Sequence, residues 1–458
     1  MKFTVKSTVL VEDLPKDLLE DVKKDLTITN PAFSKKMAMG LSIWGIDQYQ
    51  RYYSKKKNGV LEIPVGYLPK LTEEIIRRGH DAKDLIIIDQ RTAKGNKAFF
   101  GKLEFTAKLR DYQDDMKNSA LSHTLGVVQA KTGSGKTVCF VKIVVDRKQN
   151  TLILVNTKEL ASQTVDAFVN FTNLEKDDIG FIGSGRYEMK PITVGILQTM
   201  RSIVDDEDTT RLDEINGFFG QSIADETHII AAETYYNVMA SLNFKFKFGF
   251  SATPFREDGL TDVIHFANGP LIHRVPDEAV EDHLVIPGYK QIMTDYYFPL
   301  MDTSEYQNMI THMAEDKERN DFIIEYFKSV GEHLPSVFLC NRTSQVEYLH
   351  ENIENSIMLT SKMSKKLREL AMEMLRSGEA IHVASTFGLF STGLDIPRLE
   401  CEYLVSPMKS EIKLRQSAGR LMRKASGKHE AMIYDFVDKR IGLLYGQSRT
   451  RKRILTSL

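Results

Sequence analysis

The sequence has few cysteines and no long apolar run, and each of these absences excludes a class of protein. Cysteine occurs three times, at positions 139, 340 and 401, and no pair has the CxxC spacing. We therefore expect three buried structural thiols, without a zinc knuckle or a disulfide framework. No apolar run approaches the ~18 residues that a bilayer span requires. Acidic residues at positions 12 and 13 interrupt the first apolar segment, which argues against a signal peptide and favours a cytosolic protein without a membrane partner.

The chain as a whole also lacks an excess of positive or negative charge, although its charged residues are distributed unevenly. The 458 residues are 42% hydrophobic and 27% charged, with a formal net charge of −1, as in a soluble globular protein with substantial cores. Residues 1–100 nevertheless hold 18 basic and 13 acidic side chains. This excess is mild, so composition alone does not name nucleic acid as the partner. At ~150 residues per domain, the length suggests about three domains.

The pattern of apolar residues divides the chain into three parts. Residues 1–104 show strand-like patterns at 3–11, 61–68 and 85–89, and helical spacing at 14–26 and 71–78. From residue 105, short apolar strands alternate with amphipathic helices, and we expect strands at 125–130, 151–156, 192–198 and 244–250. A second such series has expected strands at 336–340, 357–360, 381–384, 402–405 and 431–436. We predict an α/β fold with a small α+β N-terminal domain (1–104) and two tandem parallel-sheet lobes (105–275 and 276–458).

A glycine-rich turn after a strand is the most informative string. LGVVQAKTGSGKT (125–137) runs from a buried strand through this turn into an apolar helix at 138–145. The glycines let backbone N–H groups surround phosphate oxygens, and the helix N-terminus adds positive potential. Lys136 is expected to reach the β- and γ-phosphates of ATP, and the Thr137 hydroxyl to hold Mg²⁺. The strict pattern has glycine where this chain has Ala130, but a small residue still permits the turn. The residues expected to bind the nucleotide here are Thr132, Gly133, Ser134, Gly135, Lys136 and Thr137.

Two adjacent carboxylates supply the metal ligand and the water-activating base that a phosphate loop lacks. DETH (225–228) follows a short and weakly apolar strand at 222–224. Asp225 can bind the metal ion through its water shell, and Glu226 can orient or deprotonate the attacking water. An isolated Asp-Glu pair is usually surface charge. Downstream of a phosphate loop in the same lobe, the pair predicts a hydrolysis site.

The order of these and further motifs resembles that of the superfamily-two helicases over about residues 105–440. The matching strings are LRDYQ (109–113), AKTGSGKT (130–137), NTKELASQ (156–163), GILQTM (195–200), DETH (225–228), SATPFR (251–256), FLCNRTSQ (338–345), STFGLFSTGLDIP (385–397) and QSAGRLMR (416–423). One string alone could be accidental, whereas the shared order is typical of the family. The resemblance implies two RecA-like lobes and a nucleic-acid-stimulated ATPase that uses ATP and Mg²⁺.

The resemblance also implies roles outside the phosphate loop. Arg110 and Gln113 would read adenine, and Gly393 and Asp395 would lie near the nucleotide. The residues implied in nucleic-acid contact are Thr157, Lys158, Gln198, Thr199, Arg342 and Thr386. The residues implied in coupling ATP to nucleic acid are His228, Ser251 and Thr253. A local hydrogen bond for the histidine and helix capping for the two hydroxyls are equally open.

The last motif contains Gln416, Arg420 and Arg423, which are expected to act in catalysis. An arginine supplied from a second lobe can stabilise the transferred phosphoryl group and raise the rate by about 10³–10⁵. Arg420 and Arg423 are three residues apart, so on a helix they would share one face. With Lys413 and Arg415 nearby, the motif alone would suggest a solvated basic helix. Together with a complete phosphate site in the first lobe, it favours arginine fingers.

Several details resemble the XPB-like branch, and within it the tailed-phage UvsW-type branch-migration helicases. These details are DETH, the TPFR extension, QSAGRLMRK and a small domain before the motor. The resemblance implies a DNA helicase or translocase that remodels branched DNA by branch migration, fork regression or D-loop unwinding. It also implies a DNA-gripping leading domain, a monomer rather than an obligate oligomer, and action in the host cytoplasm if the protein is phage-encoded. Replication or recombination proteins are possible partners, without identification.

The sequence leaves open the role of two basic segments, and it allows three alternative functions. The residues at 35, 36, 52, 53 and 55–57 suit either a DNA contact or a solvated loop, and RTRKR (449–453) is more typical of a frayed tail. An ATP-gated clamp that binds nucleic acid without moving along it would use the same pocket. An RNA helicase would share the same motifs. A P-loop kinase is disfavoured by the second lobe.

Overall fold

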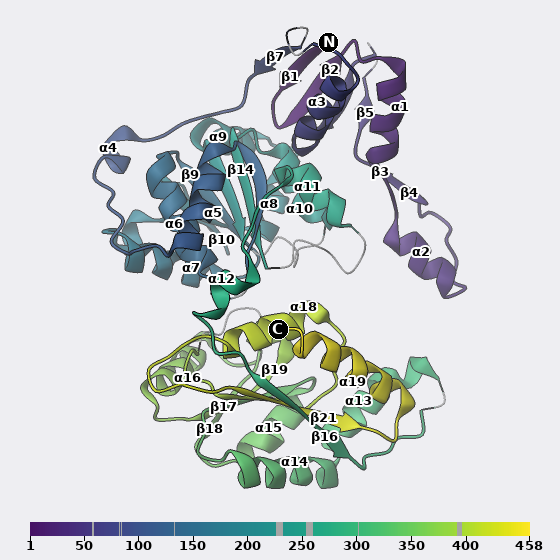
Figure 1. The fold of residues 1–458 in the computed structure, drawn as a ribbon, viewed down its shortest axis with the longest axis vertical. Coiled ribbons are helices and arrows are strands. Elements are labelled where there is room, and N and C mark those ends of the chain that lie inside the picture. The colour runs from purple at the N-terminus through teal and green to yellow at the C-terminus, as the bar shows by residue number, and fades with distance from the viewer. Residues whose placement is uncertain are drawn as a thin grey trace. The chain divides into compact units, whose positions relative to one another are not determined.

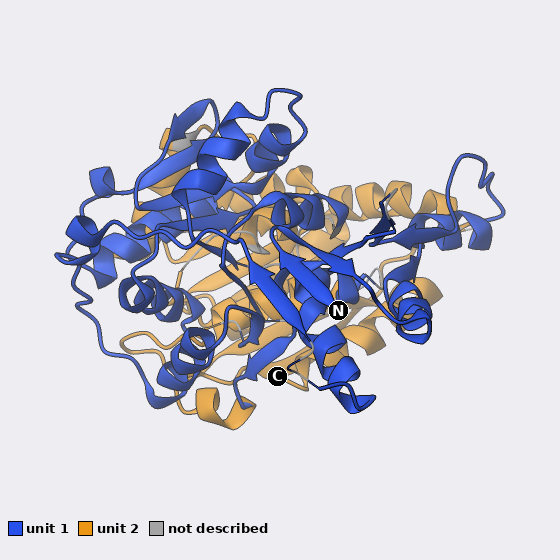
Figure 2. Cartoon of the chain, turned by 90° about the horizontal axis from the view of Figure 1, so that it is seen from above, with its two compact units in different colours: residues 1–131, 135–276 blue, residues 132–134, 277–458 orange. Residues whose placement is uncertain are grey.

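The computed structural model describes residues 1–56, 59–81, 83, 85–131, 133–225, 232–252, 260–300, 302–391 and 396–458. The chain forms two compact units, one of residues 1–131 and 135–276 and the other of residues 132–134 and 277–458 (Figure 2). In the described residues, the first unit contains three sheets and the second contains one.

The N-terminal part of the first unit is a small α+β domain. Its elements are β1 (Lys2–Val5), β2 (Thr8–Glu12), α1 (Lys16–Asp25), β3 (Thr27–Thr29), α2 (Pro31–Ala38), β4 (Tyr49–Arg51), β5 (Ser54–Lys55), β6 (Leu61–Pro64), α3 (Leu68–Arg77) and β7 (Ile86–Asp89). The main sheet has the order β5-β6-β2-β1-β7, and β3 pairs with β4 separately. In β1, Phe3 and Val5 are buried while Lys2 and Thr4 are half-buried, as period-two alternation requires.

Two details of the N-terminal prediction were wrong. The apolar residues at 3–11 form an antiparallel pair, β1 with β2, instead of one strand. The chain turns back between them, where the Lys6 backbone N–H donates to the Thr8 carbonyl at 2.8 Å. The strand expected at 61–68 ends at Pro64, and a 3₁₀ turn (Val65–Tyr67) leads into α3. Proline has no N–H to continue a strand ladder.

The first lobe is built on an eight-stranded sheet (Figure 1). Its elements are α4 (Lys97–Phe100), α5 (Asp111–Ser122), β8 (Leu125–Gln129), α6 (Lys136–Arg147), β9 (Thr151–Val155), α7 (Lys158–Phe171), β10 (Gly180–Gly183), β11 (Arg186–Glu188), β12 (Ile192–Ile196), α8 (Leu197–Val204), α9 (Thr210–Phe218), β13 (Gln221–Asp225), α10 (Ala232–Ser241), β14 (Phe246–Ser251), α11 (Thr261–Asn268) and β15 (Leu271–Arg274). The order is β11-β10-β12-β9-β13-β14-β8-β15, and every pair except β10 with β11 is parallel. Every residue of β9 and β12 is buried, because helices cover both faces of the sheet.

The N-terminal domain packs directly on the first lobe. Its apolar core includes Leu125 of β8 and Phe266 of α11. Gly66 marks the closest approach, because a Cβ built there would lie 2.1 Å from the His265 carbonyl oxygen. Only glycine permits this contact between the two backbones.

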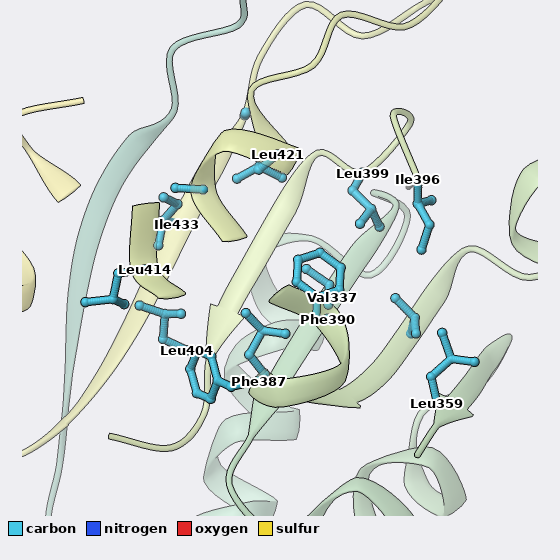
Figure 3. Close-up of a cluster of buried hydrophobic side chains, with 14 of the residues drawn as sticks. Val337, Leu359, Phe387, Phe390, Ile396, Leu399, Leu404, Leu414, Leu421 and Ile433 are labelled. Carbon is cyan, nitrogen blue, oxygen red and sulfur yellow. The ribbon is translucent and has the colours of Figure 1, made fainter. Parts of the chain in front are cut away.

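The second lobe is built on a six-stranded sheet that is parallel throughout. Its elements are α12 (Asp277–Glu281), β16 (Gly288–Thr294), α13 (Tyr306–Glu315), α14 (Lys317–Val330), β17 (Ser336–Cys340), α15 (Thr343–Asn352), β18 (Ser356–Leu359), α16 (Lys365–Ser377), β19 (His382–Thr386), α17 (Phe387–Ser391), β20 (Cys401–Leu404), α18 (Glu411–Leu421), β21 (Met432–Asp438) and α19 (Gly442–Leu455). The order is β16-β21-β20-β17-β19-β18. Figure 3 shows one of its cores, where Leu414 and Leu421 of α18 lie with Phe387, Val337 and Leu404.

The predicted α/β fold with parallel sheets is confirmed, and so are the three buried thiols. Burial raises the pKa of the Cys401 thiol to about 11, which keeps it protonated and unreactive. The frayed C-terminal tail was wrong, because 449–453 lies inside α19 and Arg451 is buried against Asp435. Among the described helices, none has the length and apolar character needed to cross a bilayer.

Candidate active site

Three neighbouring strands of the first lobe end at the predicted ATP site. The strands β8, β14 and β13 are adjacent and parallel, so their carboxyl ends share one edge of the sheet. Ser251 lies opposite Gln129, the last residue before the phosphate loop, and Asp225 lies opposite Phe250. Two strand spacings, roughly 10 Å, separate Asp225 from the end of β8. The fold therefore brings the start of the phosphate loop, Asp225 and Ser251 to one edge, where parallel α/β sheets bind ligands.

The phosphate loop has the backbone that anion binding requires. Gly133 and Gly135 have φ angles of +86° and +79°, which are left-handed values that glycine adopts at little cost. The helix α6 then begins at Lys136, whose side chain is only 7% exposed and whose Nζ donates to the Ala130 carbonyl at 3.3 Å. The Ala130 N–H donates to the Ser251 carbonyl at 3.0 Å. The base of the loop is thus tied to β14, and a buried ammonium group lies beside the N-terminus of a helix.

Gln113 of α5 lies against this loop. Its Oε1 accepts a hydrogen bond from the Arg110 N–H at 3.0 Å, which caps α5. Its Nε2 is so close to the loop that a Cβ at Gly135 would lie 2.4 Å from it. Arg110 is exposed, and its guanidinium donates to the Tyr112 hydroxyl at 2.8 Å. The glutamine therefore supports the shape of the phosphate loop, and the arginine lies at the surface beside it.

The donor groups at this edge suit Mg²⁺ held jointly with a nucleotide. Thr137 and Asp225 are both half-buried. Thr137 lies in the first turn of α6, and Asp225 is the last residue of β13. In the described residues, no three His, Cys, Asp or Glu side chains form a metal cluster. One carboxylate and one hydroxyl, completed by phosphates and water, form the usual Mg²⁺ site of nucleotide enzymes, which needs no such cluster. The residues present therefore fit the ion.

Two further strand ends carry the nucleic-acid candidates of the first lobe. The strands β9 and β12 are adjacent and parallel, with Ile196 opposite Val155. Thr157 caps α7 by accepting the Leu160 N–H at 3.2 Å, and Lys158 is the exposed first residue of that helix. In the first turn of α8, Gln198 is exposed and Thr199 is half-buried. Two helix N-termini thus meet at one edge, where backbone N–H groups and positive potential suit phosphates.

The candidates of the second lobe are arranged less uniformly. Thr386 ends β19 and is half-buried. Arg342 precedes α15, and its guanidinium is bound within the lobe. Its Nε donates to the Thr311 hydroxyl at 3.1 Å, and its Nη2 donates to Gln307 Oε1 at 2.7 Å. Arg342 therefore holds α13 in place.

The last motif departs from the single helical face predicted for its arginines. Gln416 is buried and Arg420 is half-buried, and both lie on α18. The helix ends at Leu421, however, so Arg423 lies beyond its cap. Arg423 instead forms an isolated antiparallel bridge with Leu284. The predicted shared helical face is therefore wrong, because residues three apart share a face only where both are helical, and here only Arg420 is.

Some predicted site residues lie outside the described residues. These are Thr132, Glu226, His228, Thr253, Gly393 and Asp395. Ser251 is described and is fully buried at the end of β14.

Comparisons with known proteins agree with this arrangement. The family model "Type III restriction enzyme, res subunit" matches residues 106–256, and the model "Helicase conserved C-terminal domain" matches residues 318–425. The two matches cover the two lobes in the order that the motifs predict. The chain is a superfamily-two helicase. This helicase is an ATP-hydrolysing enzyme, which confirms the predicted family and activity.

Its relatives include DNA motors and a protein named for RNA. The helicase is 26% identical to the DNA 3′-5′ translocase XPB2 of Sulfurisphaera tokodaii over 72% of this chain and 82% of that protein. It is 23% identical to the ATP-dependent DNA helicase uvsW of Enterobacteria phage T4, over 75% of this chain and 70% of that protein. A protein of Acanthamoeba polyphaga mimivirus named as an ATP-dependent RNA helicase is 26% identical, over 76% and 68%. DNA helicases and translocases are therefore among the relatives of the chain.

A solved structure supports the fold of the two lobes. The structure of S. cerevisiae Dbp5 bound to RNA and ADP BeF3 matches with a TM-score of 0.57 and 14% identity. The match covers 77% of this helicase and 88% of that chain. At this identity the likeness concerns the fold alone, and it confirms the RecA-like lobes.

Sequence reasoning missed one polar group beneath the last motif of the helicase. Glu402 on β20 is fully buried, and its Oε1 accepts a hydrogen bond from the Ser417 hydroxyl at 2.8 Å. Burial raises the pKa of this carboxyl to about 8, so it is largely protonated at neutral pH. Ser417 is the neighbour of Gln416, so Glu402 helps to fix α18. A glutamate inside the apolar run CEYLV (401–405) was the signal that could have revealed it.

Proposed function

We propose that this helicase is a DNA translocase that remodels branched DNA by branch migration, fork regression or D-loop unwinding. The observation that carries the proposal is the shared edge of the first-lobe sheet. The strands β8, β14 and β13 end at the nucleotide residues, while β9 and β12 end at the nucleic-acid candidates. Because one rigid sheet holds both sets, a change at the nucleotide can be passed to the nucleic acid over a few strand spacings.

On the nucleotide side, each residue has a distinct role. Lys136 binds the β- and γ-phosphates, and Thr137 and Asp225 hold Mg²⁺, which would neutralise charge on the phosphates. Glu226 orients and deprotonates the attacking water. In the second lobe, Arg420 and Arg423 stabilise the transferred phosphoryl group. The remaining nucleotide and coupling residues are those implied by the family: Arg110, Gln113, Gly393, Asp395, Gln416, His228, Ser251 and Thr253.

On the nucleic-acid side, the contacts are to the strand backbone. Thr157, Lys158, Gln198 and Thr199 supply hydroxyls, an amine, an amide and two helix N-termini. Thr386 adds a hydroxyl from the second lobe. Such contacts grip phosphates without reading sequence, so affinity should fall steeply with salt. Arg342 contributes mainly by holding α13, given its bonds to Thr311 and Gln307.

Branched DNA is favoured over a plain strand by the N-terminal domain and by the UvsW-type motif details. In this division of the chain, residues 1–104 grip DNA, and residues 105–275 and 276–458 form the motor. The domain packs on the first lobe through Leu125 and Phe266, so a second DNA arm held there would move with that lobe. The DNA relatives from phage T4 and Sulfurisphaera tokodaii are consistent with this substrate.

A substrate panel tests the proposal. The ATPase rate and strand displacement are measured with single-stranded DNA, blunt duplex, a fork, a four-way junction and an RNA duplex. We expect the fastest displacement on the fork and the junction. Displacement of RNA alone would establish an RNA helicase instead. ATP-dependent release without directional movement, in a single-turnover translocation assay, would establish a clamp.

A further inference from the structure

The N-terminal domain carries an exposed apolar arm that the motor motifs do not explain. The arm consists of β3, α2, β4 and the loop between α2 and β4, residues 27–51, and it extends away from the main sheet of its domain (Figure 1). The exposed fractions of its large apolar side chains are 92% for Trp44, 61% for Met37, 60% for Met39 and 55% for Leu41. A cluster of this kind on a soluble protein usually marks a binding surface.

The charge around the arm identifies the class of partner. The arm itself, residues 27–51, contains three basic side chains and one acidic one. Lys35 and Lys36 are exposed on α2, and in the described residues neither forms an ion pair. Aromatic and apolar side chains set among unpaired basic ones are typical of surfaces that stack on bases and hold phosphates. A neutral apolar partner would leave these charges without a counter-ion.

The base of the arm is fixed to the ATPase. Tyr52, directly after β4, packs edge-on against Tyr236 with ring centroids 4.8 Å apart, and against Phe266 at 5.4 Å. Its N–H donates to the Leu26 carbonyl at 2.8 Å, just before β3. Tyr236 belongs to α10, which follows the DETH motif, and Phe266 belongs to α11, which follows SATPFR. The base of the arm therefore packs on α10 and α11, the two helices that follow the catalytic motifs in the chain.

We propose that the arm is the strand-separating element of the helicase, with Trp44 stacking on an unpaired base where two strands part. Met37, Met39 and Leu41 cover the neighbouring bases, and Lys35 and Lys36 hold the flanking phosphates. Apolar side chains inserted at base steps are an established way to unstack a duplex. The inference rests on the proposed function, since it needs a nucleic-acid substrate with a branch point.

The fluorescence of Trp44 tests the contact directly, because it is the only tryptophan in the chain. Forked DNA is titrated into the full-length protein while Trp44 emission and the ATPase rate are recorded together. We expect quenching that saturates with ATPase stimulation on the fork, and weaker quenching with blunt duplex. Stimulation with unchanged emission would overturn the arm proposal alone. Absence of any stimulation by DNA would instead refute the proposed function.

Substitutions at Trp44 test its role in separation. Trp44→Ala should reduce the number of base pairs displaced per ATP hydrolysed on a fork by about tenfold, the order expected when one base loses its stacking partner. Trp44→Phe should retain most of this ratio, because a ring remains. The matched control is Ile76→Ala on α3, which removes another exposed apolar side chain (53% exposed) of the same domain and should leave the ratio unchanged.

Other results of these experiments would overturn the proposal or assign the arm to a different partner. An unchanged ratio in Trp44→Ala would overturn the proposal, and so would an equal loss in Ile76→Ala. Trp44 emission that shifts with protein concentration in the absence of DNA would assign the arm to contact with a second copy. A shift with anionic phospholipid vesicles, without one on forked DNA, would assign it to a lipid surface. Circular dichroism of each variant confirms that the exposed substitutions leave the fold intact.

Discussion

The two lobes share a parallel α/β design but place their charged residues differently. In the first lobe, the charged and polar side chains of the motifs lie at the carboxyl ends of strands, and Lys158 and Gln198 are exposed there. In the second lobe, two arginines are buried in ion pairs with the last strand, β21. Arg319 pairs with Asp438 at 2.7 Å, and Arg451 pairs with Asp435 at 2.9 Å.

This difference separates charges that serve ligands from charges that hold the fold. Asp438 also accepts a hydrogen bond from Thr294 at 2.6 Å, and Asp435 accepts one from Tyr289 at 2.7 Å. Charges with this many partners compensate one another's desolvation. Lys136 in the first lobe is also buried, but its Nζ lies 3.3 Å from the Ala130 carbonyl, a long hydrogen bond. That ammonium lies at the phosphate loop, where an ATP phosphate would be its counter-ion.

The largest expected effect is the loss of ATP hydrolysis on substitution of Lys136, compared with substitution of a lysine that only supports the fold. Lys136→Ala should lower ATP hydrolysis by at least about 10²–10³-fold, because a charge stabilising the transferred phosphoryl group is lost. The matched control is Lys247→Met on β14. Lys247 is fully buried, it donates to the Met239 carbonyl at 2.7 Å, and burial lowers its pKa to about 7. Steady-state ATPase assays should show near-normal rates for Lys247→Met. An equal loss of ATPase activity in both variants would show that Lys136 has no role beyond supporting the fold.

The arginines of the last motif sharpen the comparison within the second lobe. Arg420→Ala and Arg423→Ala should each lower hydrolysis by up to about 10³-fold, while nucleotide affinity changes far less. Arg415→Ala is the control, because Arg415 forms a half-exposed pair with Glu411 on the same helix. Single-turnover hydrolysis and nucleotide binding are measured for each. Equal losses in binding and hydrolysis would indicate a ground-state contact instead of a finger.

The sequence predicted the features that short segments determine. A strand, a turn with two glycines and a helix must follow one another at 125–147, because each local preference agrees with the next. The strand order that places Asp225 two strands from the phosphate loop was not predictable, because many topologies satisfy the same local pattern. The alternation of βα units nevertheless predicted a common edge for their carboxyl ends.

The errors occurred where distant residues decide the structure. The tail at 449–453 looked solvated, yet Asp435, more than ten residues away, draws Arg451 into the core. The end of α18 before Arg423 depends on a bridge to Leu284. The sequence marked Lys35 and Lys36 of the arm as a possible DNA contact, but it did not mark the apolar side chains, because Trp44, Met37 and Leu41 look like core residues in a sequence. Only the structure shows that they face solvent.

Removing one partner of a buried pair in the second lobe should have the next largest effect. Asp438→Ala leaves the Arg319 guanidinium buried without its carboxylate, so the free energy of unfolding should fall by about 3–5 kcal/mol. Urea denaturation followed by circular dichroism measures this loss. Glu188→Ala breaks the solvent-accessible pairs with Arg186 and Lys190 in the first lobe and should change the free energy of unfolding far less. A similar stability for both variants would show that burial does not distinguish these pairs.

The smallest expected effect is a pH dependence that arises from Glu402. Its pKa is raised to about 8 by burial, whereas an unfolded glutamate titrates near 4.5. Between these values the folded protein holds a proton that the unfolded chain has released. The free energy of unfolding therefore falls as pH rises through this window, and it is highest below it. Glu402→Gln cannot ionise, so its stability relative to the wild type should grow from about pH 5 to about pH 8, by up to a few kcal/mol.

Urea denaturation across that pH range, with Glu379→Gln as control, isolates the contribution of the buried carboxyl. Glu379 is exposed, so its curve should run parallel to that of the wild type. Ser417 on α18 donates to Glu402, so ionisation of the Glu402 carboxyl also places a negative charge against the helix that carries Gln416 and Arg420. If Glu402→Gln also runs parallel to the wild type, the carboxyl is not held protonated. A charged carboxylate would then lie beneath α18, with the Ser417 hydroxyl as its hydrogen-bond donor.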